Sequence, residues 1–233
     1  MKKEYAQYLL KKTIEDYNRI AEQFSSTRNY VPSDIIALNR YAKDGDNILD
    51  VGCGNGRLSE LFKDMKISYT GVDDSSELIR IAKSRYPESD FHITDPLNFE
   101  FTDHSFDKIY CLSVFHHIPS TELRVQYLKE IRRVLKPGGL LILTVWNMWK
   151  KKGIALKVVE DAIKHPGLDL NDTFYPFKTG DKVIKAERYI HCFKIEELEK
   201  LFMEAGFEIA GIDYLQRGDN GDNENILMLG KKD

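Results

Sequence analysis

Apolar residues recur along this chain in two patterns, one typical of helices and one typical of short buried strands. Residues 3–24 carry apolar side chains at helical spacing, and Pro32 and Ser33 begin a second helix that is expected to end near Lys43. From residue 47 onward, short apolar runs alternate with helical segments. This alternation predicts parallel βαβ units with right-handed crossovers, and therefore an α/β fold.

The boundaries of the elements follow from the apolar runs and the turn residues between them. Residues 147–190 show no regular pattern and are expected to form an irregular insertion over the strand ends. Two further β segments, 207–215 and 225–229, flank a polar turn and predict a hairpin. The other expected strands are 47–51, 68–72, 91–93, 106–112 and 140–146, and the other expected helices are 58–63, 76–85, 121–135 and 194–205.

The length of 233 residues fits one domain with a well-buried core. We divide it into a helical cap at 1–44, a cofactor-binding core at 45–146, a substrate-side insertion at 147–193, and a C-terminal helix with a hairpin at 194–233. The apolar runs are too short to cross a bilayer, and the N-terminus lacks the apolar core of a secretory signal.

Charge and cysteine usage narrow the functional classes. The formal net charge is −3, which argues against a dedicated nucleic-acid binder. Two local lysine clusters, one at 150–152 and one near the start of the chain, are interpreted as solvated surface, with a local basic face as the alternative. The three cysteines, Cys53, Cys111 and Cys192, form no CxxC pair, so we expect neither disulfides nor a metal site, and a cytoplasmic location fits best.

A glycine-rich turn after the first expected strand is the strongest single motif. Gly52, Gly54 and Gly56 form a GxGxG pattern that lets the backbone turn sharply and leaves room for a ligand. An acidic residue, Asp73, ends the second strand, where a carboxylate can accept hydrogen bonds from both ribose hydroxyls. Asp95 follows the third strand, where it can reach the edge of an adenine. The alternative is a ligand-free domain of the same fold.

These motifs occur in the order found in class I S-adenosylmethionine-dependent methyltransferases, which the chain resembles over about residues 45–146. The segments that carry the resemblance are 50–56, Asp73, Asp95, 106–107 and 133–139. It implies a Rossmann-like seven-stranded sheet, mostly parallel with an antiparallel last strand and helices on both faces, and S-adenosyl-L-methionine as cofactor. The implied cofactor-binding residues are Asp50, Gly52, Cys53, Gly54, Gly56, Asp73, Asp74, Asp95, Pro96, Leu97 and Ser113.

Further segments resemble the tRNA wobble-uridine methyltransferases that esterify a 5-carboxymethyl group on uridine 34. They are 17–28, 114–118 with Arg124, Trp146, and 188–193. The chain departs from that family at Pro32-Ser33 and Pro176-Phe177, where the family has tryptophan after proline. The resemblance implies tRNA as a partner. Because eukaryotic members of that family work with a small zinc-binding activator protein, it also implies a possible activator.

Methyl transfer to a carboxylate needs no base, because the nucleophile is already ionised near neutral pH. The protein must hold the carboxylate in line with the methyl group, and the planar guanidinium of arginine matches a carboxylate. The catalytic candidates are Arg28, His116, Arg188 and His191, and the substrate-binding candidates are Tyr17, Arg28, Trp146, Arg188 and Tyr189.

Each of these candidates also has a structural interpretation. His116 and His117 are adjacent, so at most one of them is expected to face the pocket. Two other functions stay open at this point: a small-molecule methyltransferase of the same fold, and a non-catalytic binding module that keeps the cofactor fold.

Overall fold

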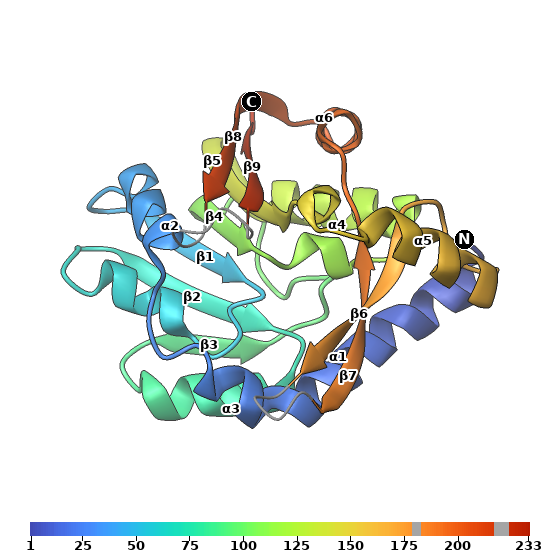
Figure 1. Ribbon diagram of the computed structural model, residues 1–233. Helices are drawn as coiled ribbons and strands as arrows, with labels where there is room; N and C mark the ends of the chain where they lie inside the picture. Colours follow the sequence, from blue (N-terminus) through green and yellow to red (C-terminus); the bar gives the residue numbers. More distant parts are fainter. Residues whose placement is uncertain (179–182, 217–223) are drawn as a thin grey trace.

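A seven-stranded sheet forms the centre of the computed structural model, which describes residues 1–178, 183–216 and 224–233 (Figure 1). Its strand order is β3-β2-β1-β4-β5-β9-β8. The strands are β1 (Asn47–Val51), β2 (Ser68–Asp73), β3 (Asp90–Ile93), β4 (Phe106–Leu112), β5 (Leu135–Trp146), β8 (Glu208–Gln216) and β9 (Glu224–Lys231).

Strands β1 to β5 pair in parallel, whereas β9 runs antiparallel to both β5 and β8. The strand order changes direction at β1: β2 and β3 follow on one side of β1, and the chain then crosses to the other side to form β4. The predicted mostly parallel sheet with an antiparallel last strand is therefore confirmed. The predicted C-terminal hairpin is confirmed as well, although most of its polar turn lies at 217–223, outside the described residues.

Helices cover both faces of the sheet, as predicted. On one face, α4 (Thr121–Val134) and α6 (Ile195–Glu204) bury Leu128 and Phe202 against β5 and β9. On the other face the cover is thinner. Two short 3-10 helices, η1 (Ala37–Tyr41) and η2 (Arg57–Phe62), bury Leu38 and Phe62 against Ile48 of β1.

Two predicted helices are shorter or tighter than expected. The second helix is a single α turn, α2 (Ser33–Ile36), which continues directly as η1. The segment after the glycine turn forms the six-residue 3-10 helix η2, which begins directly after Gly56 and its left-handed backbone angles. The predicted end of the helix before the Lys-Pro-Gly-Gly segment is confirmed, since α4 stops at Val134.

The Lys232 ammonium caps the C-terminal end of α4. Its Nζ donates hydrogen bonds to the carbonyl oxygens of Arg132 at 2.6 Å and Leu135 at 2.7 Å. Carbonyls at the end of a helix lack partners within the helix, and a cation there also interacts favourably with the helix dipole. The segment after β9 is thereby fixed to the far end of α4.

The prediction that residues 147–190 are irregular is wrong. They contain η4 (Met148–Lys150), α5 (Ile154–Lys164), β6 (Asp172–Lys178) and β7 (Ile184–His191). β6 and β7 form a separate two-stranded antiparallel sheet. The pattern hid them because α5 begins after Gly153 without a capping side chain, and Pro176 interrupts the strand signal of β6.

The first helix, α1 (Lys3–Ser26), packs against β7 and against α3 (Ser76–Arg85), as Figure 1 shows. Its Asn18 Oδ1 accepts hydrogen bonds from Ser75 Oγ at 2.8 Å and from the backbone N–H of Glu77 at 3.2 Å. α1 is therefore held at the start of α3, next to the carboxyl end of β2. Among the described residues, no helix has the length and apolarity needed to cross a membrane.

The contribution of α6 to the core can be tested with two substitutions on this one helix. Leu201 is 3% exposed and Met203 is 59% exposed. We expect Leu201→Ala to lower the free energy of unfolding by about 2–5 kcal/mol, because it leaves a cavity under the sheet. Met203→Ala is the control and should change it by less than about 0.5 kcal/mol. Urea denaturation measures both, and equal effects would contradict the packing described for this face.

Candidate active site

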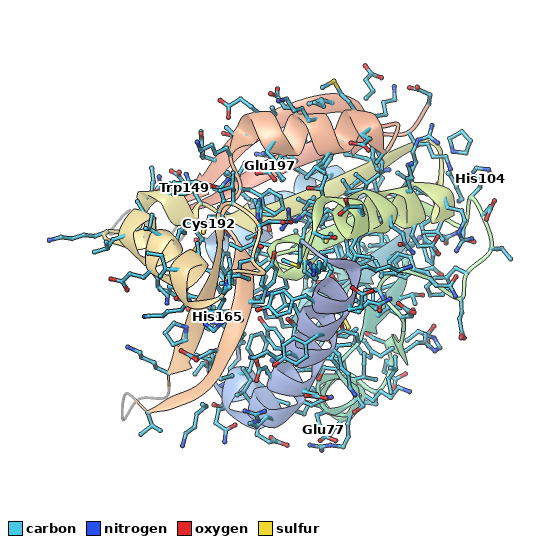
Figure 2. The ribbon with its side chains drawn as sticks, turned by 90° about the vertical axis from the view of Figure 1, so that its right-hand side faces the viewer. Glu77, His104, Trp149, His165, Cys192 and Glu197 are labelled. Carbon is cyan, nitrogen blue, oxygen red and sulfur yellow. The ribbon has the colours of Figure 1, made fainter. Side chains whose placement is uncertain are left out.

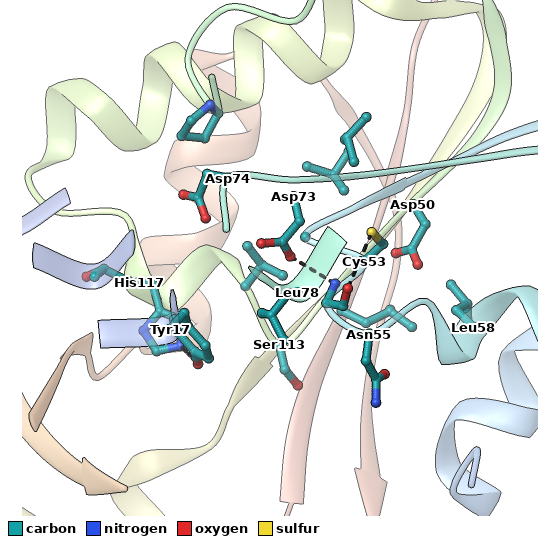
Figure 3. A pocket seen from close by; sticks show the side chains of 18 of the residues that line it. Tyr17, Asp50, Cys53, Asn55, Leu58, Asp73, Asp74, Leu78, Ser113 and His117 are labelled. Atoms are coloured by element: carbon teal, nitrogen blue, oxygen red, sulfur yellow. Dashed lines mark hydrogen bonds between the residues drawn. The ribbon is translucent and has the colours of Figure 1, made fainter. Parts of the chain in front are cut away.

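One cavity opens at the carboxyl ends of β1, β2 and β4 (Figure 3). This is the edge at which open α/β sheets bind ligands. Residues from α1 complete its wall, among them Leu10, Thr13, Tyr17 and Phe24. The helical cap and the core of the sheet therefore build the cavity together.

The glycine turn that follows β1 runs along the floor of the cavity. Gly52, Gly54 and Gly56 have φ angles of 73°, 57° and 78°, which lie in the left-handed region that favours glycine. A Cβ at Gly52 would come within 2.3 Å of Val114 Cγ2, and a Cβ at Gly56 within 2.6 Å of Phe91 Cζ. At Gly54, which lines the cavity, a Cβ would meet only Phe24 Cε1 at 3.6 Å, so the space above it is open to a ligand.

The carboxylate of Asp73 fixes this turn to the next helix. Its Oδ2 accepts a hydrogen bond from the backbone N–H of Gly54 at 2.8 Å, which Figure 3 marks, and its Oδ1 accepts one from the N–H of Ser75 at 2.9 Å. Asp73 is buried and lines the cavity. Both of its oxygens keep lone pairs that can accept further bonds from hydroxyl groups.

Two more carboxyl groups line the cavity and have raised pKa values. Burial raises the pKa of Asp50 to about 7. The Tyr69 hydroxyl donates a hydrogen bond to Asp50 at 2.7 Å, which lowers the pKa and so opposes part of this rise. Burial and the neighbouring Asp73 charge raise the pKa of Asp74 to about 8. The part of the cavity that these carboxyl groups line is therefore acidic but not fully ionised near neutral pH.

Most of the predicted cofactor-binding residues meet in this cavity. Three do not line it: Gly56 lies buried under Phe91, Asp95 is exposed and accepts a hydrogen bond from the backbone N–H of Leu97 at 2.8 Å, and Leu97 packs toward the core. The predicted residues that do line it are Asp50, Gly52, Cys53, Gly54, Asp73, Asp74, Pro96 and Ser113.

Ser113 has a backbone conformation that its sequence does not reveal. Its φ angle is 61°, and its N–H donates to the Thr144 carbonyl at 2.9 Å and to Thr144 Oγ1 at 3.0 Å. Non-glycine residues adopt this region at a cost of about 1–3 kcal/mol and do so preferentially at functional sites. The bonds to β5 hold Ser113 in place at the mouth of β4.

Aromatic and cationic side chains also line the cavity, and the part around Tyr17, Trp146 and the nearby Arg188 is called its aromatic end. Arg28 lines the cavity too, with its guanidinium 3.7 Å from the centre of the Phe24 ring. Arg188 adjoins the lining, since its guanidinium carbon lies 5.3 Å from the Trp146 ring centre and 5.9 Å from that of Tyr17. Three of the predicted substrate-binding residues thus line the cavity and a fourth contacts two of them.

The two adjacent histidines differ in their surroundings. His117 lines the cavity, and Figure 3 shows it beside Tyr17. His116 does not line it: its ring is fully buried, lies 4.5 Å from the Trp146 ring centre, and forms no hydrogen bond among the described residues. Burial holds the pKa of His116 well below its usual range. The prediction that at most one of the pair faces the pocket agrees with this arrangement, but the one that does is His117.

His191 and Tyr189 lie outside the cavity lining, in a buried polar network. The carboxylate of Asp172 accepts hydrogen bonds from Tyr189 OH at 2.8 Å and His191 Nδ1 at 2.6 Å. On its other side, His191 Nε2 lies 2.8 Å from Glu197 of α6, and Arg124 Nη2 donates to Tyr189 OH at 2.9 Å. This network connects β6, β7 and α6.

A second contact anchors the insertion nearby. The Trp149 indole N–H donates to the Cys192 carbonyl at 2.9 Å, and Figure 2 shows these two residues close together, not far from Glu197. Within the part of the chain that the structure describes, no cluster of His, Cys, Asp and Glu is arranged to hold a metal ion.

Sequence reasoning missed several residues that build the site. Asn55, inside the glycine motif, donates through Nδ2 to Ser25 Oγ and to the Arg28 carbonyl, both at 3.1 Å, and so attaches the turn to the end of α1. Thr13 and Arg57 also line the cavity. The only available signal was the position of Asn55 and Arg57 beside the glycines, because contacts across distant segments leave no local pattern.

Comparison with known proteins identifies the domain. Residues 49–143 match the family model of the methyltransferase domain. The mouse tRNA (carboxymethyluridine(34)-5-O)-methyltransferase ALKBH8 is 34% identical over 132 residues, which are 57% of this chain and 19% of that protein. The chain spans only 19% to 32% of the length of the first curated relatives that it matches.

Solved structures share the fold. An S-adenosylmethionine-dependent methyltransferase from Methanosarcina mazei is 24% identical and superimposes with a TM-score of 0.73 over 84% of this chain and 96% of that one. A methyltransferase of Haloferax volcanii, solved in complex with the Trm112 methyltransferase activator, gives a TM-score of 0.58 at 19% identity over 84% of this chain and 86% of that one.

Residues 49–143 are therefore similar to a methyltransferase domain, and S-adenosylmethionine is the cofactor that this match and the shared fold imply, as predicted. When bound, this cofactor supplies an activated methyl group on a sulfonium. The open space above Gly54 and the remaining acceptor capacity of Asp73 fit its amino-acid and ribose parts, respectively.

The glycine turn gives the first test of the cavity floor. Gly52→Ala combines a left-handed backbone with a methyl group 2.3 Å from Val114, whereas Gly153, at φ 81°, has nothing within 4 Å of a Cβ. We expect Gly52→Ala to weaken S-adenosylmethionine binding at least about tenfold in calorimetry, because the turn must shift. Gly153→Ala controls for backbone strain alone, and equal affinity in the two variants would contradict the role of the turn.

The raised pKa of Asp50 gives a test by pH. The folded state binds a proton on Asp50 up to about pH 7, whereas the unfolded state loses it near the ordinary value of 3.8, so Asp50 lowers stability as pH rises between these values. Relative to Asp50→Asn, the wild type should lose roughly 2–4 kcal/mol of unfolding free energy from about pH 4 to about pH 8. Denaturant titration at each pH measures the difference in unfolding free energy between the two proteins. The same pH dependence in both would show that the pKa of Asp50 is not raised.

Proposed function

We propose that this methyltransferase domain transfers the methyl group of S-adenosylmethionine to the carboxylate of a 5-carboxymethyl group on wobble uridine in tRNA. The observation that carries the proposal is the buried guanidinium of Arg188 at the aromatic end of the cavity. It is 3% exposed, its Nε has no hydrogen-bond acceptor, and among the described residues no carboxylate lies within ion-pair distance of it.

A buried guanidinium with no carboxylate partner is costly unless a ligand compensates its charge. Arg188 lies among the rings of Tyr17, Trp146 and Phe177, with its guanidinium carbon 5.3–5.9 Å from their centres. These rings supply no negative charge beyond their π faces. A carboxylate that enters between Tyr17 and Trp146 would meet the guanidinium and could form a paired, two-bond contact with it.

The same rings suit a nucleobase. Tyr17 of α1 and Trp146 of β5 both line the cavity, and we propose that a uracil stacks on these rings. Stacking of a base on an aromatic side chain contributes about 1–3 kcal/mol. A wobble base turned out of the anticodon would thus be held by stacking, and its carboxymethyl group by arginine.

The chemical step needs positioning more than acid or base catalysis. A carboxylate oxygen attacks the methyl carbon, the bond from carbon to sulfur breaks, and the products are a methyl ester and S-adenosylhomocysteine. Arg28 and Arg188 are proposed to hold the carboxylate. His116 does not line the cavity but contacts two residues that do, Trp146 and His117, and His191 is proposed to position β7 rather than to contact the acceptor.

A small-molecule acceptor is the second candidate, and one observation favours it. α1 places Leu10, Tyr17 and Phe24 in the cavity wall, while the lysines at 150–152 do not line it. The site is therefore less open to a large polyanion than an exposed basic cleft would be. We also propose a cytoplasmic location and a small activator protein that supplies part of the RNA-binding surface. The structural likeness to a methyltransferase solved with the Trm112 activator supports the latter.

The deciding experiment offers purified protein, with and without added activator, two tRNA preparations and labelled S-adenosylmethionine. One tRNA carries 5-carboxymethyluridine at position 34, and the other carries unmodified uridine there. We expect label only in the first tRNA, recovered by mass spectrometry as the methyl ester of the modified nucleoside. Labelling of a small acceptor while both tRNAs stay unlabelled would replace this proposal with the second candidate.

The role of Arg188 is tested by a substitution that keeps its charge. Arg188→Lys should lower kcat/KM for the modified tRNA at least about tenfold, because lysine lacks the planar fork, and should leave S-adenosylmethionine affinity within about twofold. Arg40→Lys, at an exposed position on η1, is the matched control and should leave both unchanged. A large loss of cofactor affinity in Arg188→Lys would move this arginine out of the acceptor site.

A further inference from the structure

A chain of hydrogen bonds joins three segments that are far apart in the sequence, at the acceptor end of the cavity. Arg188 Nη1 lies 3.3 Å from Tyr17 OH, and Tyr17 OH lies 2.8 Å from His117 Nε2. On the far side of the imidazole, His117 Nδ1 lies 2.8 Å from the Tyr189 carbonyl oxygen. The chain therefore connects β7, α1 and η3 (Phe115–His117).

The direction of every bond in this chain follows from what each group can do. A carbonyl oxygen only accepts, so His117 Nδ1 carries the hydrogen. Burial, helped by the Arg188 charge, lowers the pKa of His117 to about 3, so the ring is neutral and Nε2 has no hydrogen. Tyr17 must then donate to Nε2, and its oxygen accepts from Arg188, because a guanidinium only donates.

We propose that His117 is a positioning residue for the methyl acceptor: it fixes the Tyr17 hydroxyl, which in turn holds the Arg188 guanidinium toward the aromatic end of the cavity. This inference rests on the proposed function of Arg188. His117 does so through neutral hydrogen bonds in one fixed tautomer, without gaining or losing a proton.

The packing around His117 supports this role. Its ring meets the Tyr17 ring edge-on, with centres 5.3 Å apart, and the Trp146 ring with centres 6.1 Å apart. His117 is 5% exposed, so water does not replace its hydrogen bonds. If it lost the acceptor nitrogen, the hydrogen of the Tyr17 hydroxyl would have no acceptor, the hydroxyl could rotate, and the position of the oxygen that accepts from Arg188 would no longer be fixed.

The neighbouring histidine cannot do this. Both ring nitrogens of His116 are buried without a hydrogen-bond partner, and its contacts with Trp146 and His117 are ring contacts only. The two histidines therefore differ despite their identical chemistry, and of the two it is His117 that hydrogen-bonds to both α1 and β7.

The tautomer gives a direct test that needs no substrate. Nitrogen NMR of the wild-type protein at pH 7, with His117→Asn used to assign the signal, should show His117 as the neutral form with its hydrogen on Nδ1. A hydrogen on Nε2, or a charged imidazolium, would overturn the proposed direction of the chain and with it the role of His117.

A double-mutant cycle tests the effect on the acceptor. Tyr17→Phe and His117→Asn each remove the central hydrogen bond; asparagine keeps a donor for the Tyr189 carbonyl. We expect each to raise KM for the modified tRNA roughly 5- to 20-fold while KM for S-adenosylmethionine stays within about twofold, because one bond to a buried partner is lost. The double variant should be no worse than the more impaired single variant.

Tyr8→Phe is the matched control, since Tyr8 lies on the same helix with 57% of its side chain exposed, and it should leave both KM values unchanged. Multiplicative effects of Tyr17→Phe and His117→Asn would refute the chain even if each variant is impaired. If the wild type leaves the modified tRNA unlabelled, the proposed function fails and the acceptor role fails with it. If the protein methylates the tRNA but His117 carries its hydrogen on Nε2, the positioning role of His117 is refuted while the proposed function stands.

Discussion

The organisation of this protein depends on one bond: the carboxylate of Asp73 accepts the backbone N–H of Gly54, in the middle of a left-handed turn. The turn follows β1 and Asp73 ends β2, so the bond joins two adjacent parallel strands just beyond their last residues. An aspartate that holds the floor of the cavity with one oxygen and the start of α3 with the other serves folding and ligand binding together. The same geometry leaves its remaining lone pairs directed to the ligand space.

Most of the sheet is predictable from sequence because its strands are short apolar runs that end at glycine or polar residues. β1 and β4 were predicted with their observed bounds, since Asn47 and Phe106 follow polar turns. The insertion was not predictable for a physical reason. α5 lacks a capping side chain, and β6 and β7 are stabilised by Asp172, whose partners Tyr189 and His191 come much later in the chain.

The candidate site likewise has a part that the sequence predicts and a part that it does not. The positions of Gly52, Gly54 and Asp73 could largely be predicted because they depend on local backbone geometry. The arrangement of the aromatic end could not be predicted, because which of His116 and His117 enters the cavity is decided by the rotation of a single 3-10 turn. Likewise, no local pattern shows that His191 turns toward Asp172 rather than toward the acceptor.

The proposed acceptor site is shared between α1, which precedes the sheet, and β7, which lies in the insertion after β5. Transplanting the insertion alone into a related scaffold would bring Arg188 without Tyr17, the residue proposed to orient it. A graft of acceptor preference between homologous enzymes therefore has to exchange two distant blocks at once. Substitutions in α1 are constrained by the insertion that contains β7, and the reverse is also true. The two segments should therefore co-evolve more tightly with each other than with the glycine turn that lies between them in the chain.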